Sequence, residues 1–197
     1  MNHVEPQSDA EFAELLRRLQ GGAEDAWREL LARWRKPLLN FLFRMTADAA
    51  LADDVAQETF VRASRNIVQF RPAAAGLEVA FAAWLFQIAR HAALDALRHR
   101  RRHPAEALEE QPAGGGLLAD GAPSPARAAE FRDMAAVIAA AVQELPEEQR
   151  TAIILAEYHD FTVAQIAAVM GTNVKSVEAR LYRARQALRQ RLAHLLG

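Results

Sequence analysis

The chain has 197 residues, of which 51% are hydrophobic, and a formal net charge of −1, which suits one or two small soluble domains with real hydrophobic cores. It contains no cysteine, so disulfides, thiolate zinc sites and cysteine nucleophiles are excluded. The first residues lack a basic start followed by an apolar run, and no apolar stretch is long enough to cross a bilayer, so we expect a cytoplasmic protein without membrane insertion.

Apolar residues recur at helical spacing through the first hundred residues and predict an all-α domain. We place Pro37 near a junction between helices, because proline interrupts helical hydrogen bonding. The segment 70–80 contains Pro72 and Gly76 and has little periodicity, so it is expected to be a loop. The expected helices of this half cover residues 12–19, 27–34, 38–45, 51–66 and 84–102.

A change in composition separates this half from the rest of the chain. The stretch 104–127 is rich in proline, glycine and acidic residues and has too little apolar surface to fold alone, so we interpret it as a flexible acidic linker. Basic residues are concentrated on both sides of it, in the arginines of 98–102 and in the last helix. The predicted organisation is therefore a domain at 1–103, a linker at 104–127 and a domain at 128–197.

The second domain is predicted to be a four-helix module that ends in a helix-turn-helix. A helix over 131–142 precedes one that begins at Leu145-Pro146-Glu147-Glu148, with proline at its first turn and acids at the positive end of its dipole. A T-x-x-Q capping box at Thr162 starts the next helix, Gly171 ends it and Asn173 caps the last one.

The last helix has a buried stripe and a basic remainder, which is the pattern of a helix that enters the DNA major groove. Because the stripe recurs at steps of three and four residues, it defines one face of the helix. The stripe comprises Val174, Val177, Leu181, Ala184 and Leu188. The sequence therefore predicts DNA binding by this helix.

Three motifs extend this interpretation to the whole chain. They are ADDVAQETFVRA at 52–63, WLFQIARHAALDALR at 84–98 and LPEEQR at 145–150. The first two resemble the first folded domain of bacterial sigma factors, and the third, followed by the helix-turn-helix, resembles their last domain. Two such domains with only a short linker between them resemble the extracytoplasmic-function (ECF) group of the sigma-70 family. The resemblance implies a protein that binds RNA polymerase core enzyme, directs it to promoters, helps to open DNA and is not an enzyme.

The first set of candidate site residues lies on one face of the helix at 51–66. Asp54, Gln57, Glu58 and Val61 are spaced at i, i+3, i+4 and i+7, and Asp53 lies beside them. By resemblance, this face docks on the clamp of the polymerase's largest subunit. Taken without the motif, the same face is better explained as a solvated acidic surface.

The second set is expected to contact the −10 element and the melted DNA, where flipped bases need pockets and aromatic or polar groups. Its members are Phe70, Arg71, Trp84, Arg90, His91, Arg98 and Arg101. Trp84, like the neighbouring Phe81, is equally compatible with a place in the core. The family commonly has asparagine where this chain has His91, and the loop before Trp84 is longer than usual, so base-by-base roles do not carry over here.

The third set lies on the last helix and is expected to bind the −35 element. By resemblance, the residues that face bases are Glu178, Ala179, Tyr182 and Arg183. The residues better suited to phosphates are Lys175, Ser176, Arg180 and Arg185. Glu178 departs from the basic or small residue expected, and it can instead orient Lys175 or Tyr182, one turn away on the helix.

Two other functions remain open at this point. A stand-alone helix-turn-helix regulator explains the end of the chain but leaves the first domain without a task, and such regulators usually dimerise. An enzyme is disfavoured. A helical bundle can bring the i, i+4 pairs Asp54/Glu58 and His91/Asp95 together as metal ligands, but their spacing is not the Glu-x-x-His of di-iron bundles, and no glycine-rich phosphate loop, G-x-S-x-G or H-E-x-x-H motif is present. We expect no metal and no cofactor. An anti-sigma protein, which holds many relatives inactive, is a further expected partner.

Overall fold

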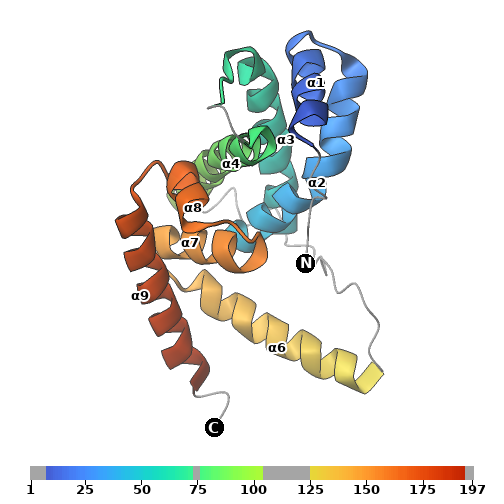
Figure 1. Cartoon of the computed structure of the whole chain (residues 1–197). Coiled ribbons are helices and arrows are strands. Elements are labelled where there is room, and N and C mark those ends of the chain that lie inside the picture. The colour runs from blue at the N-terminus through green and yellow to red at the C-terminus, as the bar shows by residue number, and fades with distance from the viewer. Residues whose placement is uncertain (1–7, 73–75, 104–124, 194–197) are drawn as a thin grey trace.

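The computed structural model of the chain describes residues 8–72, 76–103 and 125–193, with side chains from residue 134 onward in the last range. Every regular element in these ranges is a helix, as the all-α prediction requires (Figure 1). The first half contains α1 (Asp9–Gln20), α2 (Glu24–Thr46), α3 (Ala49–Asn66), the short 3₁₀ helix η1 (Ile67–Gln69) and α4 (Leu77–Arg102). The second contains α6 (Pro125–Gln143), α7 (Glu147–Tyr158), α8 (Val163–Met170) and α9 (Val174–Ala193).

Helix α2 continues through Pro37, so the predicted junction there is wrong. Proline inside a helix removes one hydrogen bond and costs about 3 kcal/mol. The apolar positions before and after it, such as Leu30 and Leu38, are both completely buried on the same side of the helix. Because a kinked or broken helix would withdraw part of this stripe from the core, burial outweighs the cost of the proline.

The loop predicted over 70–80 is shorter than expected, because α4 already begins at Leu77. Gly76 adopts a left-handed conformation with φ 70° and provides no side-chain cap. The carboxylate of Asp9, at the start of α1, accepts hydrogen bonds from the backbone N–H groups of Gly76 (3.4 Å) and Leu77 (3.1 Å) instead. A residue far away in the sequence therefore caps this helix, and local sequence patterns carry no sign of it.

The helix-turn-helix has the local structure that the sequence predicts. The Thr162 hydroxyl accepts from the Gln165 N–H (3.3 Å), and the Gln165 side chain accepts from the Thr162 N–H (2.6 Å). Gly171 is left-handed with φ 60°, and the Asn173 side chain accepts from the Ser176 N–H at 2.9 Å. Within the predicted stripe Val177, Leu181 and Ala184 are buried and Leu188 is partly buried, but Val174 is 42% exposed, so its assignment to the core is wrong.

The two halves pack directly on each other, which the sequence did not predict. Helix α8 lies against α4, and α7 lies against α2 (Figure 1). The Phe86 ring of α4 is in contact with those of His159 and Phe161, each with centroids 5.1 Å apart. The predicted linker lies outside the described residues except for its last three, 125–127, which already belong to α6.

Arg150 is the central polar residue of this contact. Its guanidinium is buried and donates to the backbone carbonyls of Met45 (3.0 Å) and Leu145 (3.1 Å), and also to that of Gln143. The Gln143 amide in turn donates to the carbonyl of Arg44 at 2.6 Å. The carboxyl end of α2 is thereby bonded to the start of α7, because its last carbonyl groups have no partner within the helix.

His159 makes the stability of this contact depend on pH. Burial, with a smaller contribution from the nearby Arg44 guanidinium, lowers the pKa of His159 to about 3. Its ring packs edge-on against those of Phe41 and Phe86, and its Nε2 atom is buried without a hydrogen bond to any described residue. The folded protein therefore keeps this imidazole neutral at pH values where the unfolded chain protonates it.

We expect the free energy of unfolding to fall as the pH drops from about 6.5 towards 3, because the unfolded state binds a proton that the folded state does not. Between pH 7.5 and pH 5, this one group accounts for about 2 kcal/mol. Urea unfolding at both pH values measures the loss, and the His159→Phe variant is expected to lack most of it. An equal loss in the variant contradicts the assignment to His159.

Candidate nucleic-acid interface

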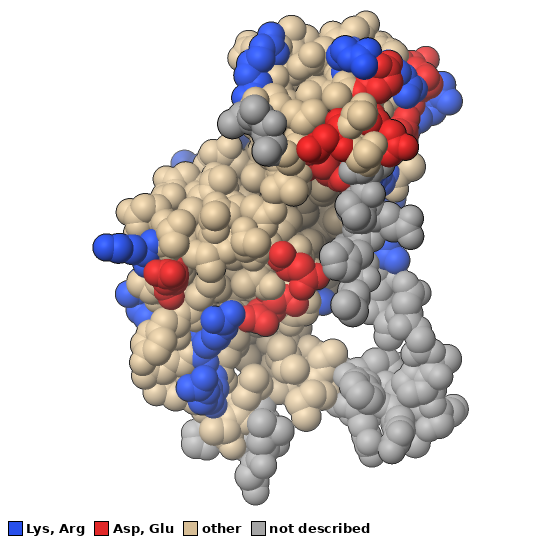
Figure 2. Space-filling model, in the orientation of Figure 1, with Lys and Arg blue, Asp and Glu red and all other residues tan. Residues whose placement is uncertain are grey.

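Helix α9 presents its polar side to solvent, opposite the buried stripe. Tyr182 is 69% exposed, and Lys175, Glu178, Arg183 and Arg185 are exposed as well. Figure 2 shows basic side chains over α9 with acidic side chains near them, and acids and bases also lie side by side over α1 and α2. A helix with one buried face and one exposed basic face suits contact with DNA.

Four members of the α9 set are partly covered or bonded within the protein. Ser176 and Ala179 are only partly exposed, and the Arg180 side chain is 22% exposed. The Arg185 guanidinium donates to Glu157 at 2.8 Å and 3.2 Å. Glu178 borders a hollow of about 280 Å³ together with Tyr182 and Arg185.

The hypothesis that Glu178 orients Lys175 or Tyr182 has no contact in the structure to support it. Among the described residues Glu178 forms no hydrogen bond or ion pair with Lys175 or Tyr182, so it orients neither of them in this structure. Its carboxylate remains exposed beside Tyr182 at the surface of α9.

The aromatic candidates of the first half are packed inside it. Phe70 is 8% exposed and stacks against Trp84 (5.0 Å between ring centroids) and Phe81 (5.7 Å). Trp84 is partly buried in the same cluster. Gln20 of α1 holds the backbone nearby, because its amide donates to the carbonyls of Ile67 (3.2 Å) and Phe70 (3.4 Å). In this structure Phe70 is a core residue, and Trp84 is only partly exposed.

The polar candidates of the same set have different environments. Arg71 is exposed and donates to the carbonyls of Val68 (2.6 Å) and Phe70 (3.0 Å). His91 is exposed, and Arg98 is exposed and pairs with Asp95 at 3.1 Å.

The arginine cluster at the end of α4 is partly used within the protein. Arg100 donates to Asp48 at 2.7 Å, and the Asp48 carboxylate also accepts from the Leu51 N–H (3.0 Å). Burial opposes ionisation of Asp48, but these two hydrogen bonds outweigh it and lower the pKa of this carboxyl. Arg100 therefore joins α4 to the start of α3, so its charge is already paired within the protein.

The polar face of α3 is exposed as the sequence predicts, but some of its side chains are paired within the protein and others are not. Asp53 accepts from Arg35 (2.8 Å) and Gln57 (3.0 Å), and Glu58 pairs with Arg62 at 2.7 Å. Asp54 is exposed, and Val61 is 41% exposed although it is apolar.

A groove of about 470 Å³ lies beside this face, between α3 and α4. Asp54 and Glu58 line it from α3, and Asp95, Arg98 and His99 line it from α4. The α3 face therefore continues into a shared surface of the two helices.

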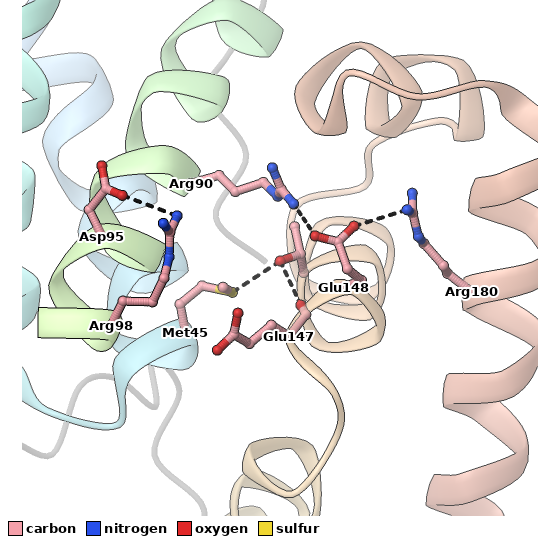
Figure 3. A network of polar contacts seen from close by, with 8 residues as sticks. Met45, Arg90, Asp95, Arg98, Glu147, Glu148 and Arg180 are labelled. Atoms are coloured by element: carbon pink, nitrogen blue, oxygen red, sulfur yellow. Dashed lines mark hydrogen bonds and ion pairs between the residues drawn. The ribbon is translucent and has the colours of Figure 1, made fainter. Parts of the chain in front are cut away.

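Two acids of α7 hold three of the predicted DNA-binding arginines, which the sequence analysis missed. Glu148 pairs with Arg90 of α4 through one carboxylate oxygen and with Arg180 of α9 at 3.1 Å through the other (Figure 3). Glu147 pairs with Arg101 at 2.8 Å. Both acids lie in the LPEEQR motif, where position alone assigned them only to the helix dipole.

Comparison with known proteins identifies the chain. Residues 30–103 match the family described as Sigma-70 region 2, and residues 135–188 match Sigma-70, region 4. The RNA polymerase sigma-H factor of Pseudomonas aeruginosa is 33% identical over 187 residues, which cover 93% of this chain and 94% of that protein. The chain belongs to the sigma-70 family. This sigma factor is also 27% identical to the ECF RNA polymerase sigma factor SigW of Bacillus subtilis, over 91% of this chain and 96% of that one.

A solved structure supports the same assignment. The arrangement of helices is similar to that of CnrH, whose structure is in complex with the cytosolic domain of CnrY, with a TM-score of 0.64 and 26% identity over 91% of this chain and 96% of that one. The chain is thus an RNA polymerase sigma factor of the ECF group, and the stand-alone regulator is not favoured. Its relatives are not enzymes.

No group of three or more histidine, aspartate and glutamate side chains is placed to hold a metal ion within the described ranges. No helix in those ranges is both long and apolar enough to span a membrane.

Proposed function

We propose that this sigma factor uses separate surfaces of its two halves for the polymerase and for the promoter. The exposed polar face of α3, with Val61 at its edge, is the surface for core enzyme. The exposed face of α9 binds the −35 element, and α4 with the segment before it acts at the −10 element. We propose residues 1–103 as the domain for core enzyme and the −10 element, 104–127 as the linker and 128–197 as the domain for the −35 element.

The α3 surface suits a protein partner because it combines charge with an exposed apolar side chain. Asp54 has no ion pair with a described residue, and Val61 lies one helix turn beyond Gln57 and Glu58. Interfaces gain most from apolar groups that become buried, while charges steer the encounter and select the partner. A basic surface on the polymerase is the complement of this acidic face.

The α9 surface suits duplex DNA, and it carries the proposal most directly. Tyr182 and Arg183 are adjacent, exposed and opposite the buried Val177 and Leu181. When the buried stripe faces the rest of the domain, these two side chains face the groove, where base edges are read. Lys175 at the amino end of the helix is placed for a phosphate.

Run-off transcription with purified core polymerase on a library of promoter fragments tests the proposal. We expect start sites that depend on the added protein, and the recognised sequence follows from their alignment. Stable binding to core without start sites would mean that the promoters are wrong, whereas no binding to core contradicts the proposed α3 role. A dimer that binds DNA tightly without polymerase would instead favour the stand-alone regulator.

We also propose a cytoplasmic location and an inhibitory protein partner. The similar structure of CnrH was obtained with the cytosolic domain of CnrY bound to it. Co-purification of this chain from its own host under non-inducing conditions tests for such a partner. A protein that binds in a one-to-one ratio and blocks run-off transcription supports the proposal.

A further inference from the structure

We propose that Glu147 and Glu148 form an acidic lock that occupies DNA-binding arginines of the free chain and must open before promoter DNA can bind. This inference rests on the DNA-binding roles proposed above for Arg90, Arg101 and Arg180. It adds to them the expectation that these ion pairs weaken DNA binding by the free chain.

The geometry of Glu148 is the first observation. One of its carboxylate oxygens contacts Arg90 of α4 and the other lies 3.1 Å from Arg180 of α9, so the acid is placed between the two halves (Figure 3). Glu147, the preceding residue, pairs with Arg101 at 2.8 Å. A carboxylate offers guanidinium groups the same kind of negatively charged oxygen acceptors as a phosphate does. The two acids thus occupy arginines that the sequence assigns to two different promoter elements.

Burial is the second observation. Arg90 is only 6% exposed and pairs with Glu148, and the Arg180 side chain is 22% exposed. A DNA phosphate cannot reach Arg90 unless the second half of the chain, which packs on α4 through α8, moves away from it. The lock therefore both covers Arg90 and Arg180 and neutralises their charge. The Arg101 side chain is 65% exposed, so its charge is neutralised but DNA can still reach it.

The contact between the halves can both hold and open. Ion pairs at partly exposed sites contribute little to stability, so Glu147 and Glu148 chiefly determine which surfaces meet, while the rings of Phe86, His159 and Phe161 supply apolar contact. Contacts between domains of one chain commonly permit relative motion. If the halves are separated in only a fraction of the free molecules, the apparent affinity for DNA equals the affinity of the separated form multiplied by that fraction. A partner that binds the separated halves, such as the polymerase, would raise this fraction.

Conversion of both acids to their amides tests the lock with little change in size. The Glu147→Gln/Glu148→Gln variant is expected to bind a short duplex from an active promoter fragment about five- to tenfold more tightly in the absence of polymerase. Fluorescence anisotropy at one fixed salt concentration measures this. The matched control is Glu14→Gln/Glu144→Gln, which removes two charges from exposed acids whose partners, Arg17 and Arg191, are not proposed DNA contacts. The control should change the affinity much less than the lock variant does.

A distance measurement provides an independent readout. The chain has no cysteine, so spin labels can be attached to cysteines introduced at Val79 of α4 and Gln190 of α9, which are both exposed. We expect one narrow distance distribution for the unchanged chain and a broader, longer one for the lock variant. An unchanged distribution together with unchanged DNA affinity would overturn the lock.

The lock and the proposed function fail in different ways. The DNA-binding roles hold if run-off transcription gives start sites and the Arg90→Ala and Arg180→Ala variants weaken promoter binding by the holoenzyme. In that case, an unchanged DNA affinity of the Glu147→Gln/Glu148→Gln variant refutes the lock alone. If these arginine variants leave holoenzyme binding unchanged, the DNA roles are refuted and the lock with them.

Discussion

The Arg150→Met variant is expected to lose about 2–4 kcal/mol of unfolding free energy, the largest stability effect we predict for a single substitution. Methionine keeps much of the apolar stem but donates no hydrogen bond. The carbonyls of Met45, Gln143 and Leu145 then lose a charged donor inside the contact between the halves. A buried acceptor left without a partner costs its full desolvation, which exceeds the net value of an ordinary hydrogen bond.

Urea unfolding followed by circular dichroism measures this loss. Arg191→Met is the control, since Arg191 also donates to a backbone carbonyl, that of Ala141 at 3.2 Å, but its side chain is 38% exposed and water can replace it. We expect the control to change stability by less than about 0.5 kcal/mol. Similar small losses in both variants would mean that Arg150 is not what joins α2 to α7.

The Asp54→Arg variant is expected to weaken binding to core polymerase at least a hundredfold, corresponding to about 3 kcal/mol. Asp54 is exposed and forms no ion pair with a described residue, in contrast to Asp53, which pairs with Arg35 at 2.8 Å. A reversed charge at this position faces the basic partner surface that the α3 face requires. The fold should be unaffected, because the side chain makes no internal ion pair within the described ranges.

Competition with a labelled sigma factor for core enzyme measures that affinity. Glu14→Arg is the matched charge reversal on α1, at an exposed position outside the proposed surface. We expect it to bind core normally. If Asp54→Arg also binds normally, the acidic face of α3 is a solvated surface and not a docking site.

The packing of the two halves on each other gives the LPEEQR motif two roles, which its sequence alone does not distinguish. Its arginine, Arg150, stabilises the contact between the halves, while Glu147 and Glu148 decide which arginines are covered by it. The first role concerns folding and the second concerns access to DNA. Variants at the two sites should therefore separate stability from DNA affinity.

Much of the local structure could be predicted from the sequence because it depends on neighbours within one or two helix turns. The T-x-x-Q box at Thr162, the left-handed Gly171 and the Asn173 cap all have the geometry that their residue types favour. Helical periodicity identified the core positions of α9 apart from Val174, which lies at the solvated end of the helix. The motifs of both halves also led to the correct family.

Tertiary structure decided the features that depend on residues distant in the sequence. The start of α4 is set by Asp9, which lies 68 residues before Leu77, and the continuity of α2 through Pro37 is set by the core on both sides of it. The burial of Arg90 behind Glu148 comes from the packing of one half on the other. Periodicity and capping report only local free energies, whereas these features depend on contacts whose partners the sequence alone does not name.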